Sequence, residues 1–430
     1  MPVPSRRRPA PARRRTLPHE APLPTKTARA LLSLALLLGG SLPGGAAESF
    51  QTIAPFALLI DADTGSVLFD KNADKEMAPA STTKILTAEI AFREIKEGRL
   101  KLDDTFVISE NAWRAGGAKS GGSTMFAALN SRIPIVDLIQ GLVVQSGNDA
   151  AIALAEGISG SEDNFAALMN RRARELGMTH SVFQNPWGRG DPNQRVTARD
   201  MALLAQHVIR TYPDLYRYFG EREFTWNKVR QLNRNPLLAM NIGADGLKTG
   251  DIAESGYGLV GSAVQNGERL IVVVNGLKTA RDRANESFKL LTWGFRAFEP
   301  RDLYGAGEVV GTAQVYGGDS REVPLVAGEA VKLLVPRGSG DGLTGKITYA
   351  GPLQAPVAAG TAVGELRVFR GATEILSVPL KTAAAVPVGA LPRRALDAGL
   401  ELGTALIRQN FGRPPAPPAN QAPQGGQAAP

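Results

Sequence analysis

Three short polar motifs, far apart along the chain, constrain the fold more than any other feature of the sequence. They are Ser81-Thr82-Thr83-Lys84, Ser146-Gly147-Asn148 and Lys248-Thr249-Gly250, and they extend over about 170 of the 430 residues. Each alone is uninformative, because such short segments are common in helix caps and turns. Together they supply serine hydroxyls, lysine amines and an amide. A fold that brings them to one point holds the groups that make and break an acyl-serine bond.

The first motif is predicted to hold a nucleophile and its base. Residues three apart share one face of a helix, so Lys84 should lie beside Ser81. A lysine with the ordinary pKa of about 10.4 is protonated at neutral pH and cannot take the serine proton. Burial and a second cation such as Lys248 would lower the pKa of Lys84. We therefore predict that Ser81, at the positive end of a helix dipole, is the nucleophile and that Lys84 is its base.

The second motif is predicted to assist these two residues. Ser146-Gly147-Asn148 falls at a break between two helical stretches, where glycine permits a tight loop. Ser146 is predicted to relay a proton to the leaving amine. The amide of Asn148 is predicted to orient Lys84 and to bind a carbonyl group of the substrate backbone.

The third motif is predicted to open a strand and to bind the substrate. Lys248 and Thr249 offer a cation and a hydroxyl to a substrate carboxylate. Gly250 lets a peptide approach the strand edge and add to the sheet. The backbone N–H groups of Ser81 and Asp251 are the predicted oxyanion hole, in which one donor is typically worth about 2.7–4 kcal/mol.

The pattern of apolar residues predicts an α+β catalytic domain over residues 48–299. Alternating residues indicate two hairpins, one around Asp63-Thr64-Gly65 and one around Asn266-Gly267. Between the hairpins, helical periodicity follows Ser81 and recurs at residues 135–144, 150–158, 162–176 and 197–212, and a last helix is predicted at residues 282–298. Strands at both ends of the domain predict an antiparallel sheet closed from both termini and covered by a helical subdomain.

The other segments are predicted to be separate units. Short alternating strands divided by Gly- and Pro-rich turns indicate a small all-β domain over residues 300–386. Residues 1–47 contain a short apolar run after basic residues, which predicts a secretory signal cleaved near Ala47. Residues 387–412 are predicted to form an amphipathic helix, and the Pro-rich residues 413–430 to be disordered.

Composition excludes several kinds of site. The chain has no cysteine, which rules out disulfides, cysteine nucleophiles and thiolate metal sites. Its formal charge of +8 falls to about +2 without the six arginines within residues 6–15. No basic stripe with interleaved aromatic residues follows, so no nucleic-acid partner is predicted. His19, His180 and His207 lack the spacing of metal ligands, so no metal or other cofactor is predicted.

Beyond the motifs, the chain resembles the low-molecular-mass penicillin-binding proteins, the D-alanyl-D-alanine carboxypeptidases of serine peptidase family S11. The likeness runs from about Phe56 to Thr382 and is carried by the segments MAPASTTKILTAEIA, GLVVQSGNDAAIALAEGISGS, TARDMALLAQHVIR, RQLNRNPLL, DGLKTG and ESFKLLTWGFRAFE. It implies a penicillin-binding-protein/β-lactamase-like transpeptidase fold followed by a β-rich domain. It also implies removal of the terminal D-alanine from peptidoglycan stem pentapeptides, with β-lactams as covalent inhibitors that acylate Ser81. Arg283 lies where such enzymes carry an arginine near the substrate carboxylate.

The resemblance further implies a location. Such a protein is exported to the periplasm, and residues 387–412 would attach it to the outer face of the inner membrane. One position departs from the family, because close relatives often carry histidine after Lys-Thr-Gly where this chain has Asp251. A carboxylate there should repel an anionic substrate. The resemblance therefore predicts neither the deacylation rate nor the affinity for β-lactams.

Three other functions share parts of this pattern. A DD-endopeptidase that cuts peptidoglycan crosslinks uses the same groups, and digestion of crosslinked muropeptides separates it from a carboxypeptidase. A serine β-lactamase must deacylate quickly, usually through a glutamate-activated water, and no Glu-x-x-x-Asn counterpart follows Ser146. A non-catalytic wall-binding protein would not need the intact set of Ser81, Lys84 and the other motif residues.

Overall fold

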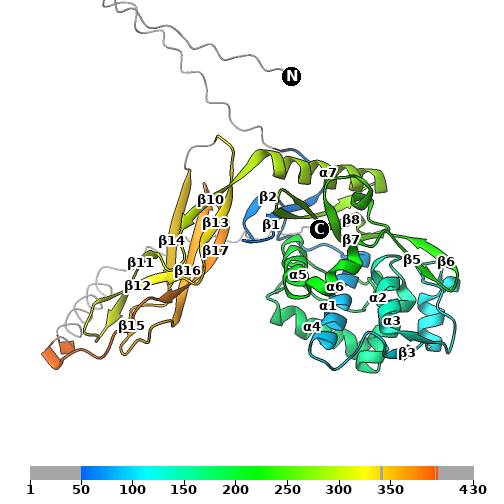
Figure 1. Cartoon of the computed structure of the whole chain (residues 1–430), viewed down its shortest axis with the longest axis horizontal. Coiled ribbons are helices and arrows are strands. Elements are labelled where there is room, and N and C mark those ends of the chain that lie inside the picture. The colour runs from blue at the N-terminus through cyan, green and yellow to red at the C-terminus, as the bar shows by residue number, and fades with distance from the viewer. Residues whose placement is uncertain (1–49, 339–341, 393, 396–430) are drawn as a thin grey trace, which may run out of the picture. The chain divides into compact units, whose positions relative to one another are not determined.

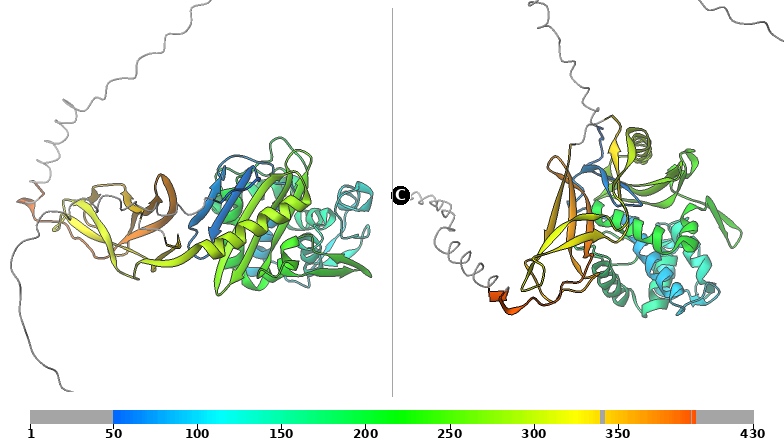
Figure 2. Two further views of the ribbon diagram at one scale, coloured as in Figure 1. Left: turned by 90° about the horizontal axis from the view of Figure 1, so that it is seen from above. Right: turned by 60° about the vertical axis from the view of Figure 1, so that its left-hand side comes forward.

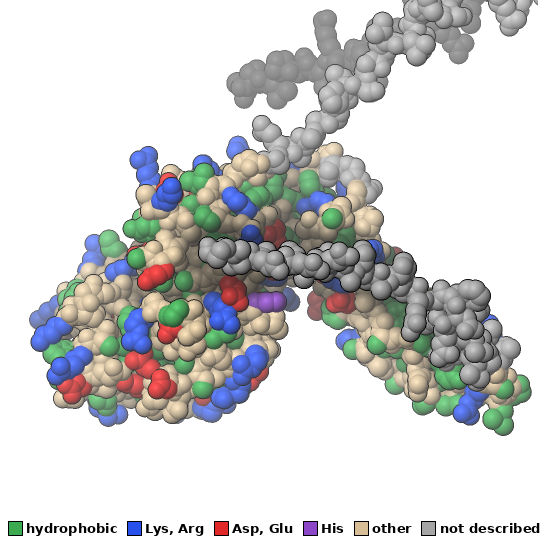
Figure 3. Space-filling view, turned by 180° about the vertical axis from the view of Figure 1, so that it is seen from behind, with side chains coloured by type: hydrophobic (Ala, Val, Ile, Leu, Met, Phe, Trp, Pro, Cys, Tyr) green, Lys and Arg blue, Asp and Glu red, His purple; other side chains and the backbone are tan. Residues whose placement is uncertain are grey.

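The computed structural model describes residues 50–338, 342–392, 394 and 395. The predicted signal segment 1–47, the predicted tail 413–430 and most of the predicted helix 387–412 lie outside the described residues. Among the residues that are described, no helix is both long enough and apolar enough to cross a membrane. On the face seen in Figure 3, basic and acidic side chains are interspersed over the surface.

The catalytic region is built on a five-stranded antiparallel sheet (Figure 1). Its order is β2 (Val67–Lys71), β1 (Phe56–Asp61), β9 (Glu268–Leu277), β8 (Gly256–Gln265) and β7 (Ala244–Ile252). β1 forms the predicted hairpin with β2 and pairs with β9 on its other side, so the sheet is made from both ends of the region. β8 and β9 are joined by Asn266 and Gly267, whose φ angles of 53° and 83° are those of a tight hairpin turn. The predicted antiparallel sheet is confirmed.

Alternate residues of the strands face two apolar cores. Leu58 and Ile60 of β1 pack into a large core together with the helical subdomain, whereas Ala57 and Leu59 pack into a second core. Leu290 and Leu291 of α7 (Ala280–Ala297) belong to that second core, and α7 lies across this face of the sheet (Figure 2). Because successive side chains of a strand point to opposite faces, a sheet buried on both faces needs apolar residues at every position.

The helical subdomain covers the other face of the sheet. Its helices are α1 (Lys84–Lys96), α2 (Ile135–Val143), α3 (Asn148–Ser159), α4 (Glu162–Glu175), α5 (Ala198–Thr211) and the short α6 (Pro213–Tyr216). Two small antiparallel pairs accompany them, β3 (Thr105–Val107) with the distant β4 (Arg132–Pro134) and the hairpin of β5 (Glu223–Trp226) with β6 (Val229–Leu232). Ser161 and Thr197 cap α4 and α5, because each side chain accepts a hydrogen bond from a backbone N–H in the first turn. α1 is buried from Lys84 to Phe92, as expected of a helix in the centre of the subdomain.

The residues after α7 form an all-β region with an apolar core of its own. Its strands are β10 (Phe298–Tyr304), β11 (Val309–Tyr316), β12 (Glu322–Ala327), β13 (Val331–Pro336), β14 (Leu343–Tyr349), β15 (Leu353–Gln354), β16 (Ala362–Arg370) and β17 (Thr373–Thr382). Six of them form one sheet in the order β14-β16-β17-β12-β11-β15, and β10 pairs with β13. The predicted fold, an α+β region followed by a small all-β region, is confirmed.

Candidate active site

Ser81, the predicted nucleophile, lies in a strained turn that leads into α1. Ser81 belongs to the 3₁₀ turn η1 (Ala80–Thr83), which continues directly into the helix at Lys84. Ala80 has a φ of 49°, in the left-handed region that side chains rarely adopt. The turn is packed against Gly188, where an added Cβ would lie 1.9 Å from the Ala80 carbonyl oxygen, so this position requires glycine. Ser81 is thus at the N-terminal end of the helix, as predicted.

The amine of Lys84 is buried and contacts three oxygen atoms. Its Nζ lies 3.0 Å from Ser81 Oγ, 2.8 Å from Asn148 Oδ1 and 2.6 Å from the backbone oxygen of Trp187. The oxygens of Asn148 and Trp187 can only accept hydrogen bonds. A neutral amine has two N–H groups and one lone pair, so donation to both acceptors directs the lone pair at the Ser81 hydroxyl. In this geometry Lys84 can take the serine proton.

Burial and charge both favour the neutral form of Lys84. Complete burial lowers the pKa of Lys84 well below its usual range, and the charges of Lys248 and Arg234 lower it further. The carboxylates of Asp149 and Asp251 raise this pKa, but their effects are smaller. Both causes suggested by the sequence, burial and the cation Lys248, are therefore present in the structure.

The second motif lies between α2 and α3. The backbone N–H of Asn148 donates to the Ser123 carbonyl at 2.8 Å, which fixes the start of α3. Ser146 is 2% exposed and has a φ of 66°, a strained conformation for a residue with a side chain. Within the described part of the chain its hydroxyl makes no hydrogen bond to Ser81 or Lys84. The proton relay through Ser146 therefore stays a prediction, whereas Asn148 contacts Lys84 directly.

Asp149 anchors the second motif, although nothing in the sequence singled it out as a site residue. Its buried carboxylate accepts hydrogen bonds from Thr124 Oγ1 at 2.6 Å and from the backbone N–H groups of Met125, Ala127 and Ala150 at 2.9, 3.0 and 3.0 Å. These bonds tie the segment before α2 to the first turn of α3. An acidic residue in the first turn of a predicted helix was the available signal.

Asp149→Ala should lower the free energy of unfolding by about 3–5 kcal/mol, because it leaves several buried donors without an acceptor. Urea unfolding followed by circular dichroism measures the change. Asp163→Ala is the matched control, since Asp163 is also in the first turn of a helix but is exposed, and its loss should stay below about 1 kcal/mol. Equal losses in the two variants would contradict an anchoring role for Asp149.

The third motif lies in the middle of β7. The strand already begins at Ala244, so the prediction that Lys248 opens it was wrong. Gly246 and Leu247, just ahead of the motif, also pair with β8. The register shifts between Ala244 and Gly246, which the sequence pattern did not reveal. β7 is the last strand in the sheet order, so a peptide can add to it. At Gly250 an added Cβ would lie 2.9 Å from the Pro79 carbonyl and 3.2 Å from the backbone nitrogen of Ser81, which explains the glycine.

Three cations gather near this motif. Lys248 is 2% exposed, and its Nζ donates a hydrogen bond to the Thr249 carbonyl at 3.2 Å. Burial, with the charges of Arg234 and Arg283, lowers the pKa of Lys248 to about 7. Arg234 precedes the turn η5 (Pro236–Ala239) and was missed in the sequence, where its signal was a basic residue within RQLNRNPLL. An anion bound here would relieve the repulsion among the cations.

Arg283 lies in the first turn of α7, and its Nε has no hydrogen-bond partner among the residues that the structure describes. The side chain is 8% exposed. Its guanidinium carbon lies 5.5 Å from the centre of the Tyr257 ring. Burial lowers the pKa of Arg283, while Asp251 and Tyr257 raise it. A buried donor without an acceptor is costly, so this guanidinium group is suited to an anionic ligand.

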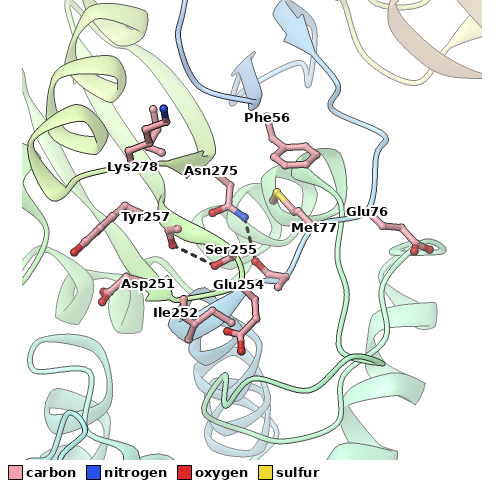
Figure 4. Close-up of a pocket in the computed structure, with 15 residues that line it drawn as sticks. Phe56, Glu76, Met77, Asp251, Ile252, Glu254, Ser255, Tyr257, Asn275 and Lys278 are labelled. Atoms are coloured by element: carbon pink, nitrogen blue, oxygen red, sulfur yellow. Dashed lines mark hydrogen bonds between the residues drawn. The ribbon is translucent and has the colours of Figure 1, made fainter.

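A half-open cavity of about 770 Å³ adjoins the end of β7 (Figure 4). Its lining includes Asp251 and Glu254, and it extends to Ala78, just before the nucleophile turn. Asn275 Nδ2 donates to the Ala78 carbonyl at 3.0 Å, so β9 holds the segment that carries Ser81. The cavity thus adjoins the segment that leads to Ser81, but Ser81, Lys84 and Lys248 are not among its lining residues.

Comparisons with known proteins place the chain among enzymes of one family. The family profile described as D-alanyl-D-alanine carboxypeptidase, peptidase S11, matches residues 45–279, and that of the penicillin-binding protein 5 C-terminal domain matches residues 298–388. The D-alanyl-D-alanine carboxypeptidase DacC of Escherichia coli K12 is 45% identical over 312 residues, which is 72% of this chain and 78% of that protein. The structure of penicillin-binding protein 5 from Haemophilus influenzae has a TM-score of 0.68 and 38% identity, covering 79% of this chain and 98% of the other. Penicillin-binding protein D2 from Listeria monocytogenes, solved in the ampicillin-bound form, has a TM-score of 0.50 and 28% identity, covering 57% and 98%.

Proposed function

The chain belongs to the S11 family of D-alanyl-D-alanine carboxypeptidases, and on this premise we propose that Ser81, Lys84 and Asn148 carry its acyl transfer. The protein is a serine-type carboxypeptidase of the penicillin-binding kind. The observation that supports the roles of these residues is the contact of the buried Lys84 amine with Ser81 Oγ and two fixed acceptors. The substrate is the D-alanyl-D-alanine end of a peptidoglycan stem peptide.

The first step forms the acyl-enzyme. The peptide pairs with β7, and its terminal carboxylate is held by Lys248, Thr249 and Arg283, with the charge of Arg234 nearby. Ser81 Oγ attacks the carbonyl carbon of the penultimate D-alanine while Lys84 Nζ takes the hydroxyl proton. The negative charge on the carbonyl oxygen is stabilised by the backbone N–H groups of Ser81 and Asp251.

The second half of the cycle releases both products. The C–N bond breaks, and the leaving nitrogen of the terminal D-alanine takes a proton that originates on Lys84 and is relayed by Ser146. A water molecule then attacks the Ser81 ester, again with Lys84 as the base. The proton returns to Ser81 Oγ as the shortened peptide leaves, so the enzyme is restored.

The direct test is D-alanine release from a stem pentapeptide, measured beside crosslinked muropeptide dimers. One equivalent of D-alanine per pentapeptide, with slower cleavage of dimers, supports the carboxypeptidase. Cleavage of dimers without release of D-alanine from the pentapeptide would assign the site to an endopeptidase instead. Nitrocefin distinguishes a β-lactamase, because a slow stoichiometric burst is expected here and rapid turnover would contradict it.

The value of kcat/KM should follow a bell-shaped pH curve. On the acid side it should rise with pH, because Lys84 must lose its proton to act as a base. On the alkaline side it should fall above pH of about 7, because Lys248 loses its charge there in the free enzyme. A bound carboxylate raises the pKa of Lys248, so kcat should lack this alkaline decline. Lys248→Arg keeps the charge at high pH and should remove the decline from kcat/KM, and a decline that persists would belong to another group.

We also propose the cellular setting and the division into domains. Export through the signal segment 1–47 would bring the enzyme to the peptidoglycan of the periplasm, and residues 387–412 would hold it at the outer face of the inner membrane. The separate apolar cores support a catalytic domain over residues 48–299 and a β-rich domain over residues 300–386. Fractionation of cells that express the full chain or a chain ending at residue 386 tests the membrane contact.

A further inference from the structure

Asp251 directly follows the third motif, and its carboxylate is exposed. It lies on the side of the site that is proposed to receive the substrate carboxylate. Thr249 and Asp251 are two positions apart in β7, so their side chains share one face of the strand. Asp251 lies directly opposite Tyr257 in the pairing of β7 with β8, which puts these side chains on one face as well. Figure 4 shows the carboxylate of Asp251 and the hydroxyl end of Tyr257 pointing the same way.

The same Tyr257 also locates Arg283 beside Asp251. The guanidinium carbon of Arg283 lies 5.5 Å from the centre of the Tyr257 ring. No ion pair within 4.0 Å and no hydrogen bond joins Asp251 to Arg283 or to any other described side chain. Asp251 nevertheless raises the pKa of Arg283, Lys248 and Lys84, as a nearby negative charge does. Its carboxylate is therefore an unpaired charge within electrostatic reach of the cations.

We propose that Asp251 is a specificity-determining residue whose carboxylate opposes the terminal carboxylate of the substrate. The proposal rests on the proposed function, since it concerns the same acyl transfer at Ser81. Arg283 is buried and its Nε has no hydrogen-bond partner among the described residues, so it attracts an anion, but the anion must come close to Asp251. The three cations alone would give the enzyme a strong preference for peptides with a free C-terminal carboxylate over neutral ones. Asp251 weakens that preference. Its substrate class extends to peptides that end in a neutral D-alaninamide.

The test compares kcat/KM for two peptides that differ only at the C-terminus, D-Ala-D-Ala and D-Ala-D-alaninamide. Asp251→Asn keeps the shape and the backbone N–H but removes the charge. It should raise the ratio of free acid to amide by about tenfold at low salt, mainly through a lower KM for the free acid, and less at high salt. The amide peptide should change by less than about twofold.

Two further variants separate local charge from other effects. Glu254→Gln removes an exposed carboxylate three residues after Asp251. In this variant the ratio of kcat/KM for the free acid to that for the amide should change by less than about twofold. In an Arg283→Met background, Asp251→Asn should raise the ratio much less than in the wild type. Without Arg283, the substrate carboxylate is no longer drawn close to the Asp251 carboxylate. Asp251→Ser repeats the measurement with a smaller neutral side chain, should the asparagine variant fold poorly.

An unchanged ratio in both Asp251→Asn and Asp251→Ser would overturn the proposal. An equal change for both peptides would also overturn it, because it would show an effect on the backbone or the fold. Failure of the proposed function looks different, since the wild type would then hydrolyse neither peptide, or Ser81→Ala would hydrolyse both.

Discussion

Ser81→Ala should abolish both D-alanine release and covalent labelling by penicillin, with kcat reduced by a factor on the order of 10⁶. Of the three oxygen atoms in contact with the Lys84 amine, the Ser81 hydroxyl alone can serve as a nucleophile. Without it, the carbonyl carbon of a bound peptide or β-lactam has no partner for an ester bond. The same variant must lose both activities, because penicillin and the peptide acylate one atom.

The measurements for Ser81→Ala are D-alanine release and gel detection of a fluorescent penicillin. Thr83→Val is the matched control, since Thr83 lies in the same turn and its buried Oγ1 has no hydrogen-bond partner among the described residues. The control should keep its activity within about threefold and should lose no stability, because it removes an unsatisfied polar atom. Persistence of either activity in Ser81→Ala would refute the assignment of the nucleophile.

Lys84→Met should slow acylation by about 10²–10⁴-fold while the protein stays folded. Methionine fills a similar volume but cannot take the proton from Ser81. The bonds to Asn148 Oδ1 and the Trp187 carbonyl are lost, which costs stability. That loss is offset because the folded protein no longer has to bury an amine. Labelling at a rate near that of the wild type would refute the role of Lys84 as base.

A pH series tests the burial of Lys84 independently of activity. Below pH of about 10.4 the unfolded chain protonates Lys84, whereas burial lowers the pKa of Lys84 in the folded protein. The unfolded state therefore binds more protons, and this group makes wild-type stability rise with pH from the folded-state pKa to about 10.4. Lys84→Met lacks this contribution, so its stability relative to the wild type should be highest at neutral pH and should decline toward pH 10. Lys96→Met, at an exposed position on the same helix, should show no such trend.

Local patterns predicted most of the helices and two hairpins of the sheet. The predicted helices agree closely with α2, α3, α4, α5 and α7, because each has an apolar face that repeats along the helix and is bounded by caps or turns. The two hairpins follow from alternation around turn residues with positive φ, such as Asn266 and Gly267. The start of β7 was misplaced, because its first residues pair through an irregularity that has no local signature.

The sequence by itself determined which chemistry the chain can perform. Ser81, Lys84, Asn148 and Lys248 could be predicted as site residues because each reaction step needs a particular functional group, and their order and spacing are those of one enzyme family. Lys84 and Ser81 are only three residues apart, so a helical turn alone is enough to bring their side chains together.

Only the tertiary structure decided how that chemistry is controlled. The acceptors that orient the Lys84 lone pair, Asn148 and Trp187, are 64 and 103 residues away along the chain. The anchoring role of Asp149 and the charges of Arg234 and Asp251 near the two lysines likewise depend on packing between distant segments. Sequence periodicity reports which face of an element is buried, but a pKa depends on burial and on charges a few ångströms away. Those distances exist only once the sheet and the helices have packed together.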